Sequence, residues 1–262
     1  MAHTTAANYR NSFEYPELTK IFGRPSYDSL KLIEDELKAN AQAVFSPLGG
    51  GQHGHLGLVV SPFQYASVSN IPFITPPTPR PFVIIPQEAP HVAQQRLAQH
   101  NTSKELFQEV HGVKRALVQQ LIQAVDKTYL KDMRHPLTNT LDHLQIYEIL
   151  NNLFQRYGQI SASQLTVLEE QVKNMAWDPS QPIDNIFTAI DRLSDAAYRA
   201  GSEYSAAQKN NMAQVILTRT GAFRTGLRNW LHLPIPMRTW EAFKTHFRTE
   251  QGLLEAVHEG TL

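Results

Sequence analysis

The sequence predicts a mainly α-helical protein with two helical lobes joined by a short linker. From residue 91 onward, apolar residues recur at three- and four-residue spacing in one segment after another, which is typical of amphipathic helices. Ser, Gly and Pro stand where such helices begin and end. At 262 residues, the chain is long enough for two modest lobes, each with its own core.

Composition excludes several classes of protein. The chain has no Cys, which rules out disulfide scaffolds, thiolate zinc sites and cysteine nucleophiles. Its 24 basic and 24 acidic residues leave no net charge that would draw the whole molecule to nucleic acid or to a membrane. No apolar run approaches the roughly 18 residues of a membrane-spanning helix, and no hydrophobic signal region begins the sequence. We therefore expect a soluble, unsecreted protein without a membrane partner.

Residues 1–14 are small and polar, and we expect them to form a mobile tail ahead of an N-terminal lobe at residues 15–176. The lobe opens with a helix that Ser26 or Ser29 caps, and the proline-rich residues 70–90 form an extended arm. Because apolar residues are interleaved with the prolines, we expect the arm to pack on its own lobe or on a neighbouring subunit. Binding of the arm to a proline-recognition domain is the alternative.

A glycine-rich segment at residues 49–57 leads into two short apolar runs, and these runs predict a short β-hairpin at about residues 55–69. His53 and His55 alternate as strand neighbours do, so both can face the same way and offer two nitrogens to a metal. No companion ligand is identifiable by spacing, and no Gly-Lys-Ser or Gly-Lys-Thr follows the glycines. We expect a structural turn, with metal binding and anion binding as alternatives.

Three further helices complete the predicted N-terminal lobe. The first runs from Ser103 to about Val125, the second ends at Gly158, and the third spans about 161–175. A linker at residues 177–181 follows, and its tight turn is interpreted as the hinge between lobes: Asp178, Pro179, Ser180 and Gln181.

A C-terminal dimerisation lobe of four helices is predicted at residues 182–262. Four residues of its second helix can share one face and are the candidate assembly interface: Gln208, Met212, Val215 and Arg219. The alternative is that Met212 and Val215 are ordinary core residues. The densest basic set is a candidate for salt-sensitive contacts with RNA: Arg219, Arg224, Arg228 and Arg238. A solvated surface is the alternative for these arginines.

From Val113 to about Leu254, the sequence resembles the Gag capsid region of Ty1/copia-type long-terminal-repeat retrotransposons. The matching features are Lys-Arg-Ala-Leu at 114–117, Leu-x-x-Leu-Phe-x-x-Tyr ending at Tyr157, the helix at 182–201, and Thr-Trp-Glu-Ala-Phe at 239–243. The glycine-rich segment also resembles the upstream part of Gag proteins from copia-like elements of algae and related protists. The resemblance lies in the order and spacing of these patterns.

This resemblance implies a two-lobed, retroelement-type capsid protein. Such a protein forms dimers and then the pentamers and hexamers of a virus-like particle, which encloses the element's RNA in the cytoplasm of a eukaryotic host. It uses no cofactor. The usual Cys-rich zinc knuckle is missing, so either a nucleocapsid part lies beyond this segment or basic side chains alone hold RNA. Gln181, Asp184 and Arg192 match the polar pattern of retroviral capsids only in part, and we interpret them as an internal brace.

The residues themselves also favour a structural protein over an enzyme. No Ser-His-Asp elbow, no carboxylate pair in an apolar pocket and no cofactor fingerprint is recognisable. Two alternatives remain open. One is a domesticated capsid-like protein that carries RNA or scaffolds partners, and the other is a metal-dependent enzyme that uses His53 and His55.

Overall fold

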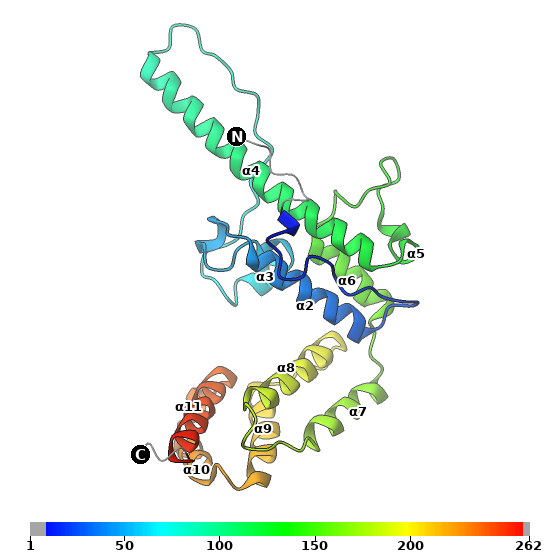
Figure 1. The fold of residues 1–262 in the computed structure, drawn as a ribbon, viewed down its shortest axis with the longest axis vertical. Coiled ribbons are helices and arrows are strands. Elements are labelled where there is room, and N and C mark those ends of the chain that lie inside the picture. The colour runs from blue at the N-terminus through cyan, green and yellow to red at the C-terminus, as the bar shows by residue number, and fades with distance from the viewer. Residues whose placement is uncertain (1–8, 259–262) are drawn as a thin grey trace. The chain divides into compact units, whose positions relative to one another are not determined.

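The structure, a computed structural model, describes residues 9–258 and is mainly helical, as predicted (Figure 1). The chain divides into two compact units, Met1–Gly158 and Gln159–Leu262, which we call unit 1 and unit 2. Within the described part of the chain there is no β-strand. A search of the same residues finds no helix with the length and apolar character that crossing a membrane requires.

Unit 1 is organised around three helices, α2 (Tyr27–Ala43), α4 (Pro90–Ala124) and α6 (Ile146–Tyr157). Ser26 begins α2 with a capping box, in agreement with the predicted start. Apolar residues of α2, of α6 and of the C-terminal half of α4 form one continuous core. The short helices α5 (Lys127–Leu130) and η3 (Lys131–Met133) connect α4 to α6.

The predicted mobile tail covers residues 1–14, of which residues 1–8 lie outside the described part of the chain. The prediction is wrong for the remainder. Phe13 is buried in the unit 1 core, and Tyr9 packs against that core. At the next residues of the chain, the backbone carbonyls of Tyr15 and Pro16 each accept a 2.8 Å hydrogen bond from the Gln120 side chain. Aromatic rings and one buried amide therefore anchor a segment whose composition is mostly polar.

The predicted β-hairpin at residues 55–69 is also wrong. Leu56–Leu58 form one turn of 3₁₀ helix, η2, and Pro62–Tyr65 form the short helix α3. Ser61 and Pro62 lie between the two apolar runs, where the hairpin required a turn. They are instead the N-cap and the first residue of α3. The apolar run before it is buried at consecutive residues, so it lacks the alternation of a half-exposed strand.

The glycine-rich segment wraps closely around the end of α2, and the expected structural turn is observed there. Gly54 adopts φ of +50°, and a Cβ atom at this position would lie 2.5 Å from the Val44 carbonyl oxygen. Gly49, in the 3₁₀ turn η1 (Leu48–Gly50), accepts a 3.1 Å hydrogen bond from the Tyr65 hydroxyl. Close packing of the backbone therefore explains why glycine occupies these positions.

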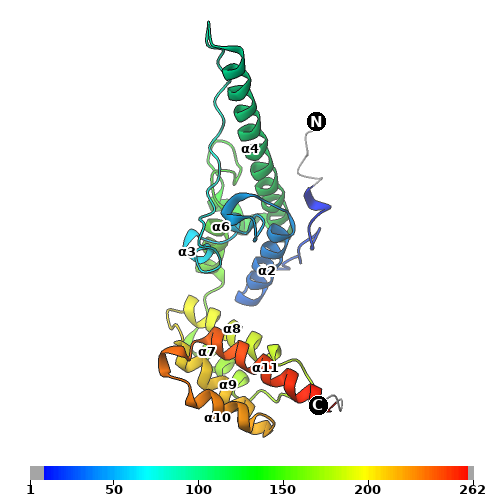
Figure 2. The ribbon, with the colours of Figure 1, turned by 90° about the vertical axis from the view of Figure 1, so that its left-hand side faces the viewer.

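The proline-rich arm has no regular secondary structure, and it packs on its own lobe (Figures 1 and 2). Helix α4, however, begins at Pro90, whereas the sequence analysis placed the start of this helix at Ser103. Proline is favoured in the first turn of a helix, and good helix formers follow it here. Helical structure from residue 91 onward agrees with the sequence, but the cap was misplaced because no side chain of the early turns enters the core, so these turns carry no apolar stripe.

Unit 2 contains five helices among the residues that the structure describes. They are α7 (Ala162–Lys173), α8 (Asp184–Arg199), α9 (Ala206–Thr220), α10 (Arg224–His232) and α11 (Trp240–His258), with the 3₁₀ turn η4 (Ile235–Met237) before the last. Aromatic rings fill the centre of its core, and the Phe243 and Phe247 centroids are 4.4 Å apart.

The division between the units lies after Gly158, ahead of α7, whereas the sequence placed it at residues 177–181. Trp177 is buried in the unit 2 core, where its ring lies 5.8 Å from the Phe223 ring. Val172 of α7 belongs to the same core. Helix α7 therefore joins the four helices of the predicted C-terminal lobe, and the predicted hinge lies inside unit 2.

Candidate functional site

Residues 204–240 of unit 2 contain five basic residues and no acidic residue. The segment comprises α9, α10 and η4, and its cations are Lys209, Arg219, Arg224, Arg228 and Arg238. All 24 acidic residues of the chain lie elsewhere. Because no carboxylate is adjacent in sequence to neutralise them, these cations concentrate positive charge on one part of unit 2.

Two of the four arginines predicted to face RNA are used inside the unit. Arg238 donates hydrogen bonds to the Leu233 carbonyl at 2.9 Å and to the Leu231 carbonyl at 2.8 Å. Arg219 donates to the Lys173 carbonyl at the end of α7. Both guanidinium groups therefore stabilise chain turns.

The other two, Arg224 and Arg228, lie one turn apart on α10 and are exposed. Neither has an ion-pair partner among the described side chains of residues 9–256. Side chains at i and i+4 share one face of a helix, so both can contact the same polyanion. These two residues are the part of the predicted basic set that remains available to RNA.

The predicted interface on α9 is only partly at the surface. Met212 is 6% exposed and packs in the unit 2 core, so it fits the alternative of an ordinary core residue. Val215 is 40% exposed and does not. Gln208 forms the capping box of α9 with Ser205, which is an additional structural role. Of the two apolar residues in the middle of this stripe, Met212 is therefore buried within its own unit and Val215 is not.

A cluster of exposed apolar residues lies at the connection between α10 and α11, which we call the apolar knob: Leu231, Ile235 and Met237. Their exposed fractions are 54%, 79% and 61%. The connection is held in place by Arg238, and the Asn210 side chain donates a 2.8 Å hydrogen bond to the Arg238 carbonyl. Sequence reasoning missed this cluster because Leu-Pro-Ile-Pro was interpreted only as the end of a helix.

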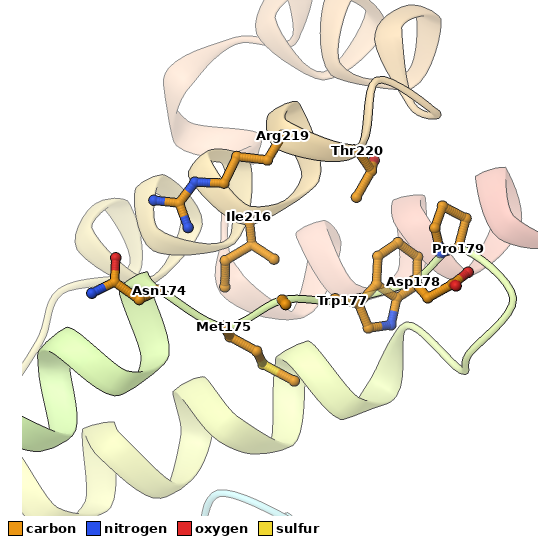
Figure 3. A pocket seen from close by; sticks show the side chains of 9 residues that line it. Asn174, Met175, Trp177, Asp178, Pro179, Ile216, Arg219 and Thr220 are labelled. Atoms are coloured by element: carbon orange, nitrogen blue, oxygen red, sulfur yellow. The ribbon is translucent and has the colours of Figure 1, made fainter.

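A groove of about 550 Å³ lies between the residues after α7 and the end of α9 (Figure 3). Met175, Trp177 and Ile216 give it an apolar lining, and Asp178 and Pro179 of the predicted hinge also line it. Arg219 extends across it toward Asn174. The Asp178 side chain accepts a 2.8 Å hydrogen bond from the Ser180 amide, and this bond lowers the pKa of the Asp178 carboxyl. Such a bond stabilises a turn, which fits a fixed connection.

Of the three side chains interpreted as an internal brace, only that of Asp184 has such a contact among the hydrogen bonds and ion pairs of the described residues, because Gln181 takes part through its backbone. The Gln181 carbonyl accepts a 2.9 Å hydrogen bond from Gln251, and Asp184 pairs with Arg248 at 2.6 Å. Arg192 is exposed on α8. The partners on α11, Gln251 and Arg248, were not identified from the sequence, because nothing in the spacing indicates which helix packs on α8.

His53 and His55 are held by different partners in unit 1. His53 Nε2 is 3.0 Å from the Val68 carbonyl oxygen, whereas His55 is fully buried with Nε2 at 3.4 Å from the Glu109 carboxylate. Burial lowers the pKa of His55 to about 4, so it is neutral near pH 7. Among the side chains that the structure describes, at residues 9–256, no group of three or more potential metal ligands occurs.

No family model, characterised protein or solved structure matches this sequence. The function is therefore inferred from the residues and their arrangement. Two surfaces of unit 2 carry the inference, the pair Arg224 and Arg228 and the apolar knob beside it in sequence.

Truncation of Met212 and of Val215 should have different effects on unit 2, although both lie on α9. Met212→Ala removes buried contacts and should lower the free energy of unfolding by about 2–4 kcal/mol, whereas Val215→Ala should change it by less than about 0.5 kcal/mol. Urea unfolding followed by tryptophan fluorescence measures this, because all three Trp residues lie in unit 2. Equal effects of the two substitutions would contradict the burial of Met212.

Acidification should destabilise unit 1 through His55. Its folded-state pKa lies below the ordinary value, so the unfolded chain takes up the proton first, and stability is lost as the pH falls from about 6.5 to about 4. Between pH 7 and pH 5 we expect a loss of about 2 kcal/mol from this group. Urea unfolding followed by circular dichroism at both pH values, with tryptophan fluorescence to identify the unit 2 transition, measures it.

The matched variants are His55→Gln and the exposed His143→Gln. The first should lose most of this pH dependence and the second should keep it. Retention of the full pH dependence in His55→Gln would show that another group is responsible.

Proposed function

We propose that the protein is a capsid-type structural protein that assembles with copies of itself and encloses RNA. This agrees with the resemblance of residues 113–254 to the Gag capsid region of Ty1/copia-type elements. The observation that carries the proposal is the segment at residues 204–240, which combines five basic residues and no acidic residue in its sequence with the apolar knob. Particles of this kind would form in the cytoplasm of a eukaryotic host.

The apolar knob supports the self-association part of the proposal. Three large apolar side chains within seven residues are exposed, and hydrogen bonds from Arg238 and Asn210 hold the backbone that carries them. A rigid exposed apolar surface loses little conformational freedom when a partner covers it. Isolated exposed apolar residues are ordinary, but a fixed group of three is typical of an interaction site.

Arg224 and Arg228 support the RNA part. Phosphate contacts from Arg are independent of base sequence and are weakened by salt. The aromatic residues Phe223, Trp230 and Trp240 in or beside this segment are all buried, so they offer no exposed ring on which a base can stack. The proposed RNA contact is therefore electrostatic, weak and tolerant of sequence.

Replacement of Ile235 by Asp should abolish particle formation by the full chain. The substitution places a charge at the most exposed residue of the apolar knob, where burial against a second copy would leave that charge unpaired. Negative-stain electron microscopy with and without added RNA measures the outcome. The control is Val167→Asp, at a residue of α7 that is 51% exposed and outside the knob.

We expect particles from the unchanged chain and from Val167→Asp but not from Ile235→Asp. Absence of particles from the unchanged chain at every salt and protein concentration would overturn the proposed function. Particles from Ile235→Asp would show that the knob is not an assembly contact.

Double substitution of Arg224 and Arg228 by Ala should weaken RNA binding and reduce its salt dependence. Each lost phosphate contact lowers the slope of log K against log salt by about 0.7 for a single strand, so the slope should fall by about 1.4. Fluorescence anisotropy with a labelled, unstructured RNA across a salt series measures the slope. Arg192→Ala, at an exposed arginine outside the basic segment, should leave it unchanged. An unchanged slope in the double variant would refute the role of the α10 arginines.

A further inference from the structure

The N-terminal half of α4 and the proline-rich arm together form a projection from unit 1, which we define as residues 74–105 (Figures 1 and 2). The arm runs beside this half of the helix in both views. None of the residues 91–109 is buried, and the buried residues of α4 begin at Val110. A helical segment without buried side chains is only marginally stable in water. The turns of α4 that belong to the projection therefore contribute no residue to the unit 1 core.

Specific contacts hold the arm against the helix. Arg96 pairs with Glu88 at 2.6 Å and donates a 3.1 Å hydrogen bond to the Val83 carbonyl. His100 Nε2 lies 2.9 Å from the Arg80 carbonyl oxygen, and its ring packs on that of Phe82 with the centroids 5.5 Å apart. These contacts use the polar groups of the projection internally and fix the course of the arm. The exposed apolar side chains of the arm are consequently presented on a defined backbone.

Six large apolar residues of the projection are between 37% and 82% exposed: Ile74, Val83, Ile84, Ile85, Val92 and Leu97. Their summed exposed area is roughly 650 Å², which is comparable to the ~800 Å² that each partner contributes to a standard interface. The neighbouring Gln, Asn and Thr residues can supply the polar rim of such an interface.

The projection has almost no net charge. Residues 74–105 contain five charged side chains, Arg80, Glu88, Arg96, Lys104 and Glu105, which sum to +1, and Arg96 and Glu88 neutralise each other. A nucleic acid or an anionic membrane surface requires a cluster of cations, which this region lacks. A second identical projection has the same low charge and the same apolar area, so it is a suitable partner.

We infer that the projection is a homotypic interface, in which the arm and early α4 of one copy pack against those of a second copy. A two-fold arrangement buries the same residues on both copies and closes as a dimer. The inference rests on the proposed self-assembly and names a contact of unit 1 that is separate from the apolar knob of unit 2. Ile84, the most exposed of the six residues, lies in the interface.

The test measures dimerisation while particle formation is blocked. In the full chain carrying Ile235→Asp, sedimentation velocity over a range of protein concentrations should show a monomer–dimer equilibrium. Addition of Ile84→Lys should weaken dimerisation by at least about tenfold, because a buried Lys without a partner costs more than 1.4 kcal/mol. Addition of Leu137→Lys, at a loop residue of unit 1 that is 90% exposed and outside the projection, should leave it unchanged.

A second variant tests the arm by another route. Arg96→Ala removes the contacts with Glu88 and Val83 and should also weaken dimerisation, while circular dichroism should show that most of the helical content remains. Monomers at all concentrations in the Ile235→Asp background, or dimers that Ile84→Lys leaves intact, would overturn the inference. Either result is distinct from failure of the proposed function, which is read from particles of the unchanged chain.

Discussion

The arrangement of unit 2 depends on the contact between the start of α8 and the last helix, α11. The Gln251 side chain accepts a 2.8 Å hydrogen bond from the Ile183 amide and donates one of 2.9 Å to the Gln181 carbonyl. A single buried amide thus satisfies both polar groups of a backbone turn that would otherwise be buried without partners. Nearer the start of α11, the Phe187 ring of α8 packs edge-on against Trp240. Because these contacts close the unit, they also set the course of the chain between α8 and α11.

The same contacts explain why positive charge remains on α9 and α10. Asp184 pairs with Arg248, and Asp191 accepts a 2.6 Å hydrogen bond from the Trp240 indole and contacts Lys244 at 3.4 Å. Two of the three carboxylates of α8, Asp184 and Asp191, are therefore engaged with α11. No carboxylate occurs between residues 204 and 240, so Arg224 and Arg228 keep their charge available for a partner. The ion pair of Asp184 with Arg248 is half exposed and contributes little to stability by itself, whereas the buried Gln251 amide contributes more.

Most helices were predicted correctly because an apolar stripe and a cap are both local in sequence. Ser26, Ser161 and Ser205 begin helices as expected. The errors occur where a partner distant in sequence decides the outcome. Nothing local distinguishes Met212, which meets the core, from Val215, which does not. Likewise, nothing local distinguishes Arg219 and Arg238, which donate hydrogen bonds to backbone carbonyls, from Arg224 and Arg228, which have no ion-pair partner among the described side chains. The early turns of α4 lack a stripe because they have no core to face.

The projection formed by early α4 and the proline-rich arm affects how an assembly grows under the proposed function. A closed two-fold interface joins two copies and leaves nothing unpaired on the surface that forms it, so by itself it yields only dimers. Continued growth requires a second contact elsewhere on the chain. Unit 1 and unit 2 each carry a surface of this kind, the projection in one and the apolar knob in the other. Since the two surfaces belong to separate cores, a copy can be paired through unit 1 and still bind further copies through unit 2. Under the proposed function, this separation turns a dimerising protein into one that builds a shell.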